Sequence, residues 1–242
     1  MGAAVPEHLV KSFEGELETL STHVAQMGGV VEAVLQGAID AVARRDSPLA
    51  DRTIATDRCI DDFERQIEGE AVKILALRQP VGVDLRLTVS ALRIANELER
   101  IGDLAKNLAK RALVLNREQP LRLTQGLVRM GRECLSQLKA VLDAYAARDV
   151  AAAEAVWRRD EEIDELYNSL FRELLTYMME DPRTISLATH LLFVAKNLER
   201  VGDHATNIAE QVAYLAGGTF LGEDRPKGDE TSTTAVPYES AP

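Results

Sequence analysis

An internal duplication constrains this chain more than any other feature of its sequence. The string L-E-R-I-G-D-L-A-K-N at Leu98–Asn107 returns 100 positions later as L-E-R-V-G-D-H-A-T-N at Leu198–Asn207. The string D-R-C-I-D at Asp57–Asp61 returns 103 positions later as D-E-E-I-D at Asp160–Asp164. Self-similarity at a nearly fixed period predicts two copies of one structural unit in tandem.

Composition and periodicity predict that both copies are helical. Pro, Gly and aromatic residues are sparse, while Ala, Leu, Glu and Arg dominate, and these residues lose little freedom in a helix. Apolar residues recur at alternating steps of three and four, which places them on one helix face. In the first helix they are Val10, Phe13, Leu17, Leu20, Val24, Met27, Val31 and Val34. We therefore expect an all-α fold.

Breaks in the periodic pattern divide each copy into three helices. The first helix should end near Asp46, because Pro48 disfavours helical geometry in the residue before it and a Ser or Asp can cap the helix that follows. The second helix should stop at Pro80, and the pattern restarts after Pro120. Six long antiparallel helices in two tandem three-helix bundles follow from this division.

These breaks also set the expected domain bounds, with one bundle in residues 1–117 and the other in 118–217. Gly217 and Gly218 should end the last helix. Residues 218–242 are rich in Gly, Pro, Ser, Thr and acids, so we expect a disordered tail there.

Charge and targeting signals narrow the class of function. The formal net charge is -11, which argues against nonspecific nucleic-acid binding, since that needs clustered Lys and Arg. The N-terminus lacks the basic start and apolar run of a signal peptide, and no segment reaches the ~20 apolar residues of a membrane span. We expect a cytoplasmic protein. Cys59 and Cys134 stand alone, so neither a disulfide framework nor a zinc site is indicated.

Acidic pairs at i and i+4 recur on the second and third helix of each copy. Their members are Asp57, Asp61, Glu99 and Asp103 in the first copy and Asp160, Asp164, Glu199 and Asp203 in the second. Like charges at this spacing cost a bare helix about 0.2–0.5 kcal/mol, so matched sets suggest a positive group between them. A hard divalent cation would serve. Spacing alone leaves open the alternative that Arg100 and Arg200 pair with these acids.

Glycines sit inside both third helices, at Gly102 and Gly202. A helical Gly costs about 1 kcal/mol relative to Ala, which predicts that either a cation or a neighbouring helix approaches the backbone there. His204 lies about 100° round the helix from Asp203, so we interpret it as a neighbour of the acids and not a ligand.

The sequence offers no evident catalytic residues. No Glu-x-x-His pair of the di-iron bundle type precedes any of the four His residues, and we find no Gly-rich phosphate loop or nucleophile elbow. A metal-dependent hydrolase is therefore the weakest of the functional hypotheses. A carboxylate-based protein that binds or stores metal is a stronger alternative.

The paired L-E-R-x-G-D-x-A-x-N strings, with their D-x-x-I-D partner helices, resemble the signature of the PhoU family over roughly Val10 to Ala216. The resemblance implies a non-enzymatic, dimeric regulator that represses phosphate uptake and phosphate-starvation signalling. It implies an adaptor between the ATPase subunit of a phosphate ABC transporter and a membrane sensor histidine kinase. It also implies metal ions (Fe, Mn, Mg or Zn) on the eight acids named above.

The two copies differ beside this signature, where Glu97 in the first corresponds to Asn197 in the second, and Leu104 to His204. With one fewer nearby acid, the second copy is expected to bind a dication more weakly if both bind metal. Equal affinities in a titration would count against that expectation.

Overall fold

The computed structural model describes residues 7–119, 124–219, 221 and 231. Its α-helices are α1 (Glu7–Arg44), α2 (Ser47–Arg78), α3 (Gly82–Leu115), α4 (Thr124–Ala147), α5 (Val150–Arg158), α6 (Asp160–Glu180) and α7 (Ile185–Gly217), with a 3-10 turn at Pro182–Thr184 between α6 and α7. No strand occurs in the described part of the chain. The prediction of an all-α fold is confirmed. The expected disordered tail falls almost entirely outside the described residues.

The turn after the first helix is built in the same way in both halves. Arg45 and its counterpart Arg148 both adopt left-handed backbone geometry, with φ of 55° and 52°. The next residue caps the following helix in each case, since Asp46 Oδ1 accepts from Leu49 N at 2.9 Å and Asp149 accepts from a backbone N–H of α5 at 3.1 Å. The predicted helix boundary at Asp46 is thus confirmed, and the duplication extends to capping geometry.

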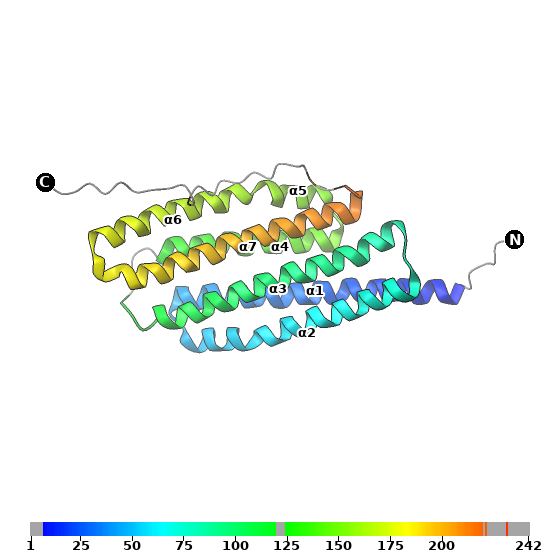
Figure 1. Ribbon diagram of the computed structural model, residues 1–242, viewed down its shortest axis with the longest axis horizontal. Helices are drawn as coiled ribbons and strands as arrows, with labels where there is room; N and C mark the ends of the chain where they lie inside the picture. The colour runs from blue at the N-terminus through cyan, green and yellow to red at the C-terminus, as the bar shows by residue number, and fades with distance from the viewer. Residues whose placement is uncertain (1–6, 120–123, 220, 222–230, 232–242) are drawn as a thin grey trace.

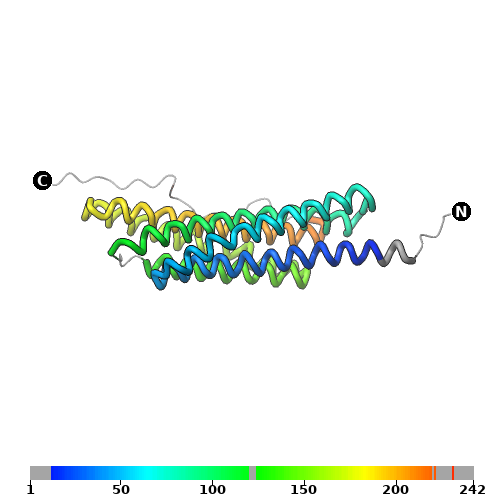
Figure 2. Tube along the Cα trace, turned by 90° about the horizontal axis from the view of Figure 1, so that it is seen from below, coloured from blue at the N-terminus to red at the C-terminus, as the bar shows by residue number. Residues whose placement is uncertain are grey.

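The helices run side by side along the long axis of the molecule, as Figures 1 and 2 show. α1, α2 and α3 pack on one another, as do α4, α5, α6 and α7, and the two groups meet where α3 contacts α7 and α1 contacts α4. Buried residues of both groups belong to one hydrophobic cluster, which includes Leu20, Met27 and Leu98 from the first and Met130 and Leu138 from the second. The core is therefore continuous. The domain bounds at residues 117 and 217 stay a prediction.

The two halves differ in the second helix, which is continuous as α2 but interrupted at Arg159 between α5 and α6. At the break Gln137 Nε2 of α4 donates to the Arg159 carbonyl at 2.8 Å, and the Arg159 side chain pairs with Glu133 and Glu162. A side-chain donor from α4 thus satisfies a carbonyl at the interruption. The break makes Asp160 the first residue of α6.

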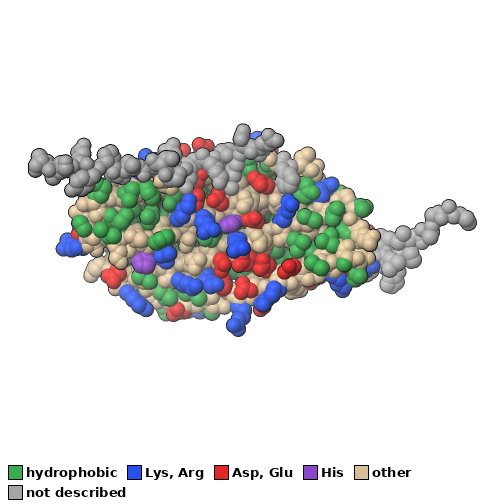
Figure 3. Space-filling view, viewed as in Figure 1, with side chains coloured by type: hydrophobic (Ala, Val, Ile, Leu, Met, Phe, Trp, Pro, Cys, Tyr) green, Lys and Arg blue, Asp and Glu red, His purple; other side chains and the backbone are tan. Residues whose placement is uncertain are grey.

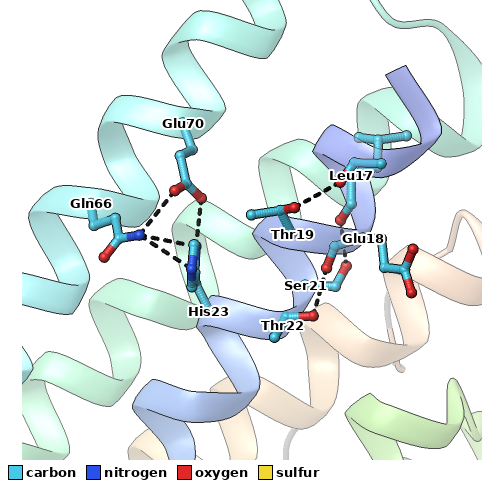
Figure 4. A network of polar contacts seen from close by, with 9 residues as sticks. Leu17, Glu18, Thr19, Ser21, Thr22, His23, Gln66 and Glu70 are labelled. Atoms are coloured by element: carbon cyan, nitrogen blue, oxygen red, sulfur yellow. Dashed lines mark hydrogen bonds and ion pairs between the residues drawn. The ribbon is translucent and has the colours of Figure 1, made fainter. Parts of the chain in front are cut away.

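A polar network fastens α1 to α2 (Figure 4). His23 Nδ1 lies 2.8 Å from Glu70 Oε2, and Gln66 Nε2 donates to Glu70 Oε1 at 3.1 Å. Nearby hydroxyls on α1 bond back to carbonyls one turn earlier, as Thr19 does to Gly15. None of the acids predicted to bind metal takes part in this network.

No helix in the described residues is both long and apolar enough to cross a membrane.

Candidate functional site

The predicted acids form two matched sets on adjacent helices. We call Asp57 and Asp61 of α2 with Glu99 and Asp103 of α3 the first acidic stripe, and Asp160 and Asp164 of α6 with Glu199 and Asp203 of α7 the second acidic stripe. The face in Figure 3 shows Asp and Glu side chains gathered over the middle of α3 and α2, with Lys and Arg around them.

The glycines inside α3 and α7 admit a neighbouring helix. A Cβ built on Gly102 would lie 2.7 Å from Ile60 Cδ1 of α2, and one on Gly202 would lie 2.8 Å from Ile163 Cδ1 of α6. Ile60 and Ile163 are themselves counterparts in the duplication. Of the two explanations for these glycines, close helix packing is the one that the structure supports, and it holds the two helices of each stripe together.

Lys106 lies within the first acidic stripe and pairs with two of its four acids. Its Nζ donates to Asp57 Oδ2 at 2.5 Å and to Asp103 Oδ1 at 3.2 Å, so one ammonium bridges α2 and α3. The hydrogen bond to Asp57 raises the pKa of Lys106, which keeps the ammonium charged. A cation therefore already lies where these carboxylates converge.

Glu99 experiences the opposite electrostatic environment in the same stripe. Burial, followed by the negative charge of Asp103, raises the pKa of Glu99 above its usual value. Arg100 Nε lies 3.5 Å from a Glu99 oxygen, while Arg200 has no carboxylate within 4.0 Å among the described residues. Pairing between the adjacent arginine and the acids, one of the sequence alternatives, thus occurs in the first half only.

The second acidic stripe is more deeply buried. Asp160, Asp164 and Glu199 are only 2%, 5% and 6% exposed. In the first stripe Asp57 is buried, but the other three acids are half-buried. A buried carboxylate needs hydrogen bonds or a paired charge, so the two stripes place different demands on their neighbours.

Different residues satisfy these buried carboxylates. Thr206 Oγ1 donates to Asp160 Oδ1 at 3.1 Å, and Thr206 occupies the position that Lys106 holds in the first half. Lys196 Nζ lies 2.9 Å from Glu199 Oε2 and 4.9 Å from the centre of the Tyr167 ring. The position of Lys196 is Asn96 in the first half. Each stripe therefore has a lysine ammonium of its own, but Lys106 lies near the end of the repeated string and Lys196 lies two residues before its start.

Glu97 joins the two halves and does not extend the first acidic stripe. Its Oε2 lies 2.7 Å from His204 Nδ1 and accepts from Asn207 Nδ2 at 3.1 Å, both on α7. Burial acts to raise the pKa of Glu97, but the bonds from His204 and Asn207 outweigh it and lower that pKa. The extra carboxylate assigned to the first stripe from sequence thus points toward α7, and it gives no reason for a weaker second site.

The donor chemistry of the stripes suits a hard cation, since all eight predicted residues offer carboxylate oxygens. The structure brings Asp57 and Asp103 together through Lys106, and Glu99 beside Asp103. Among the described residues, no three His, Cys, Asp or Glu side chains converge in an arrangement that would hold a metal ion. Metal binding at these acids stays a prediction.

Sequence reasoning missed the two lysines. Lys106 lies three residues after Asp103, and Lys196 lies three residues before Glu199, so both spacings bring opposite charges together on one helix. Comparing the repeated strings position by position, with Lys106 against Thr206, would have exposed the difference.

Comparison with known proteins gives consistent results along almost the whole chain. The sequence model of the PhoU domain matches residues 24–112 and 127–212. The phosphate-specific transport system accessory protein PhoU homolog of Caulobacter vibrioides (strain NA1000 / CB15N) is 53% identical over 227 residues, which are 93% of this chain and 99% of that protein. The homolog of the same name in Rhizobium meliloti (strain 1021) is 49% identical over 93% of this chain and 96% of its own.

Solved structures agree with the fold. A crystal structure of PhoU from Pseudomonas aeruginosa superimposes with a TM-score of 0.84 at 41% identity, and covers 86% of this chain and 100% of its own. The phosphate transport system regulatory protein PhoU from Streptococcus pneumoniae gives a TM-score of 0.80 at 31% identity, over 87% of this chain and 99% of its own.

Proposed function

This chain belongs to the PhoU family, and on that premise we propose that it is a non-enzymatic accessory protein of a phosphate transport system that represses phosphate uptake when phosphate is plentiful. One observation carries the proposal: the 53% identity to a protein named as a phosphate-specific transport system accessory protein spans 99% of that protein's length. Similarity over a whole chain supports a shared role more strongly than similarity of fold alone.

At a finer level, we propose that the protein acts in the cytoplasm as an adaptor. Its partners would be the ATPase subunit of a phosphate ABC transporter and a membrane sensor histidine kinase, and it would work as a homodimer. The family resemblance supports this role. The acidic net charge and the acids gathered over α2 and α3 favour basic contact surfaces on those partners.

Deletion of the gene in its own host tests the repressor role. With abundant phosphate, the deletion strain should show raised phosphate uptake and a derepressed starvation reporter, and the wild-type gene should restore both. Repression and uptake that stay normal in the deletion strain would contradict the proposal.

Pull-down with purified partners tests the adaptor role separately. Wild-type protein should retain the ATPase subunit and the soluble part of the kinase. A charge reversal in the first acidic stripe, Asp61→Lys, should weaken at least one contact because it removes complementary charge. Asp51→Lys, an exposed change on the same helix, serves as the control. Retention of neither partner by the wild type would refute the adaptor role.

A second candidate function is metal binding at the acidic stripes, either alongside regulation or as storage. The matched acids on adjacent helices of both halves favour it, because carboxylate oxygens are the ligands that hard cations prefer. Fe, Mn, Mg or Zn would be held by carboxylate oxygens and would supply positive charge that links α2 to α3 or α6 to α7.

Elemental analysis of protein purified without chelators tests this candidate. Stoichiometric metal in the wild type that is lost in the double variant Asp103→Asn, Asp203→Asn would support it. No metal in either protein, even after loading with Fe, Mn or Mg, would leave the acids as partner-binding or structural charges.

A further inference from the structure

A cavity of about 560 Å³ lies at the end of the bundle where the two halves meet. It is formed where α1 and α3 end and where α4 and α7 begin, at the left in Figure 1. Its volume falls within the range of about 300–1,000 Å³ that is typical of small-molecule sites. None of the eight acids of the stripes lines it.

The cavity combines an apolar floor with a basic rim. The apolar residues are Val42, Leu115, Val128, Leu187 and Leu191. The charged residues are Arg45, Arg129 and Arg132, and none of the described residues that line the cavity is Asp or Glu. In a chain of net charge -11, three arginines at one cavity give a local positive field, which favours an anionic ligand.

Arg45 is held in place on this rim. Its backbone has a φ of 55°, and its Nη2 donates to the Asn116 carbonyl at 2.8 Å and to the carbonyl of Glu118. The guanidinium therefore lines the cavity with a fixed orientation and keeps further N–H donors for a ligand.

Arg129 and Arg132 are exposed, and they lie one turn apart on α4. Neither has a carboxylate partner within 4.0 Å in the described part of the chain. By contrast, the exposed Arg158 pairs with Glu154 at 2.5 Å. Two adjacent unpaired guanidiniums beside an apolar surface can bind a doubly charged oxyanion such as a phosphate group.

We propose that this cavity binds a small amphipathic phosphate, in which the phosphate group contacts Arg129 and Arg132 and an apolar or planar body covers the floor between Val128 and Leu191. The apolar body is needed because inorganic phosphate alone would leave the floor uncovered. A nucleotide and an acyl or alkyl phosphate share this chemistry.

Calorimetric titration of the full-length protein tests the proposal with three probes: octyl phosphate, AMP and inorganic phosphate. At least one organic probe should bind saturably and about tenfold or more tighter than inorganic phosphate, because it also buries apolar surface. Preference for octyl phosphate points to a lipid-like source, and preference for AMP points to a nucleotide.

The double variant Arg129→Ala, Arg132→Ala should weaken that binding by about tenfold or more, since charge-assisted hydrogen bonds are lost. Arg158→Ala, which removes an exposed arginine of α5, should leave it unchanged, and circular dichroism should show that both variants are folded. Absence of saturable binding by either organic probe would overturn the proposal. So would binding that the double variant retains, because it would place the ligand elsewhere.

Discussion

The two acidic stripes have the same carboxylates at equivalent positions but neutralise them differently. In the first stripe the half-buried ammonium of Lys106 bridges Asp57 and Asp103 across two helices. In the second stripe a buried hydroxyl, Thr206, serves Asp160, while Lys196 pairs with Glu199 at the other end. The close contacts at Gly102 and Gly202 are nearly identical. Duplication has thus kept the helix packing while the charges around the acids diverged.

The largest change in stability should come from the glycine contact that both halves share. Gly102→Val and Gly202→Val should each lower the free energy of unfolding by about 2–3 kcal/mol, because the added carbons meet Ile60 or Ile163. Denaturant unfolding measures the change. Gly69→Val is the control, since a Cβ there meets nothing within 4 Å. A large loss of stability for one variant and none for the other would show that the two glycine contacts are not equivalent.

A smaller loss, of about 1–2 kcal/mol, should follow Thr206→Val, which removes a donor from the buried Asp160 without changing the side-chain shape much. Lys106→Met in the first stripe should cost less, about 1 kcal/mol, because Asp57 and Asp103 both keep more contact with water than Asp160 does. Thr189→Val, which removes an exposed hydroxyl of α7, the helix that carries Thr206, is the control. If Lys106→Met lowers the free energy of unfolding more than Thr206→Val does, the acids of the first stripe depend more on their partner than those of the second, contrary to our expectation.

The contact of Glu97 with α7 should contribute about 1 kcal/mol to the free energy of unfolding. Glu97→Asn, which installs the residue of the other half, removes the acceptor for His204 and Asn207. Because the folded-state pKa of Glu97 is lowered, its contribution is present above the unfolded pKa and is lost as the pH falls through the folded pKa. Unfolding midpoints measured from neutral to acid pH should therefore converge for the variant and wild type. Parallel curves would contradict the assignment.

Replacing the lysine of each acidic stripe should raise the affinity of that stripe for a metal ion. Lys106→Thr and Lys196→Asn each install the residue that the other half carries. If the stripes bind metal, each variant should bind Mn²⁺ about fivefold more tightly at its own stripe, since a competing charge worth about 1 kcal/mol is gone. Isothermal titration of both variants measures this change. Unchanged affinity in both would show that the lysines do not compete with metal.

The smallest effect, about 0.2–0.5 kcal/mol, is expected for Glu99→Gln. The folded-state pKa of Glu99 is raised, so its favourable contribution is present below the unfolded pKa and is lost as the pH rises through the folded pKa. The variant should accordingly be slightly more stable than the wild type at pH 7, and the gap should close toward pH 4. A destabilised variant at pH 7 would mean that ionised Glu99 is favourable where it lies.

Local patterns in the sequence were sufficient to predict the end of the first helix and the face that it buries. Of the residues predicted to face inward from the first helix, Leu17, Leu20 and Val24 are buried, and Asp46 caps the next helix. The interruption at Arg159 was not predictable, because no Pro or Gly marks it and the donor to its carbonyl, Gln137, comes from another helix.

The chemistry of the candidate site was only partly predictable for a similar reason. The acids and their pairing along each helix follow from spacing. The link from Lys106 to Asp57 depends on the register between α2 and α3, and the direction of Glu97 depends on how α3 meets α7. Neither of these long-range relations is encoded in a local pattern.

The shared core leaves α2 and the α5–α6 helix as the outer members of the two groups, one on each half. A single chain thereby presents two related but chemically unlike outer faces. A partner held on one face would raise the effective concentration of whatever the other face binds, without any change of shape. If two partners bind these faces, the divergence of the charges after duplication would let the chain discriminate between them.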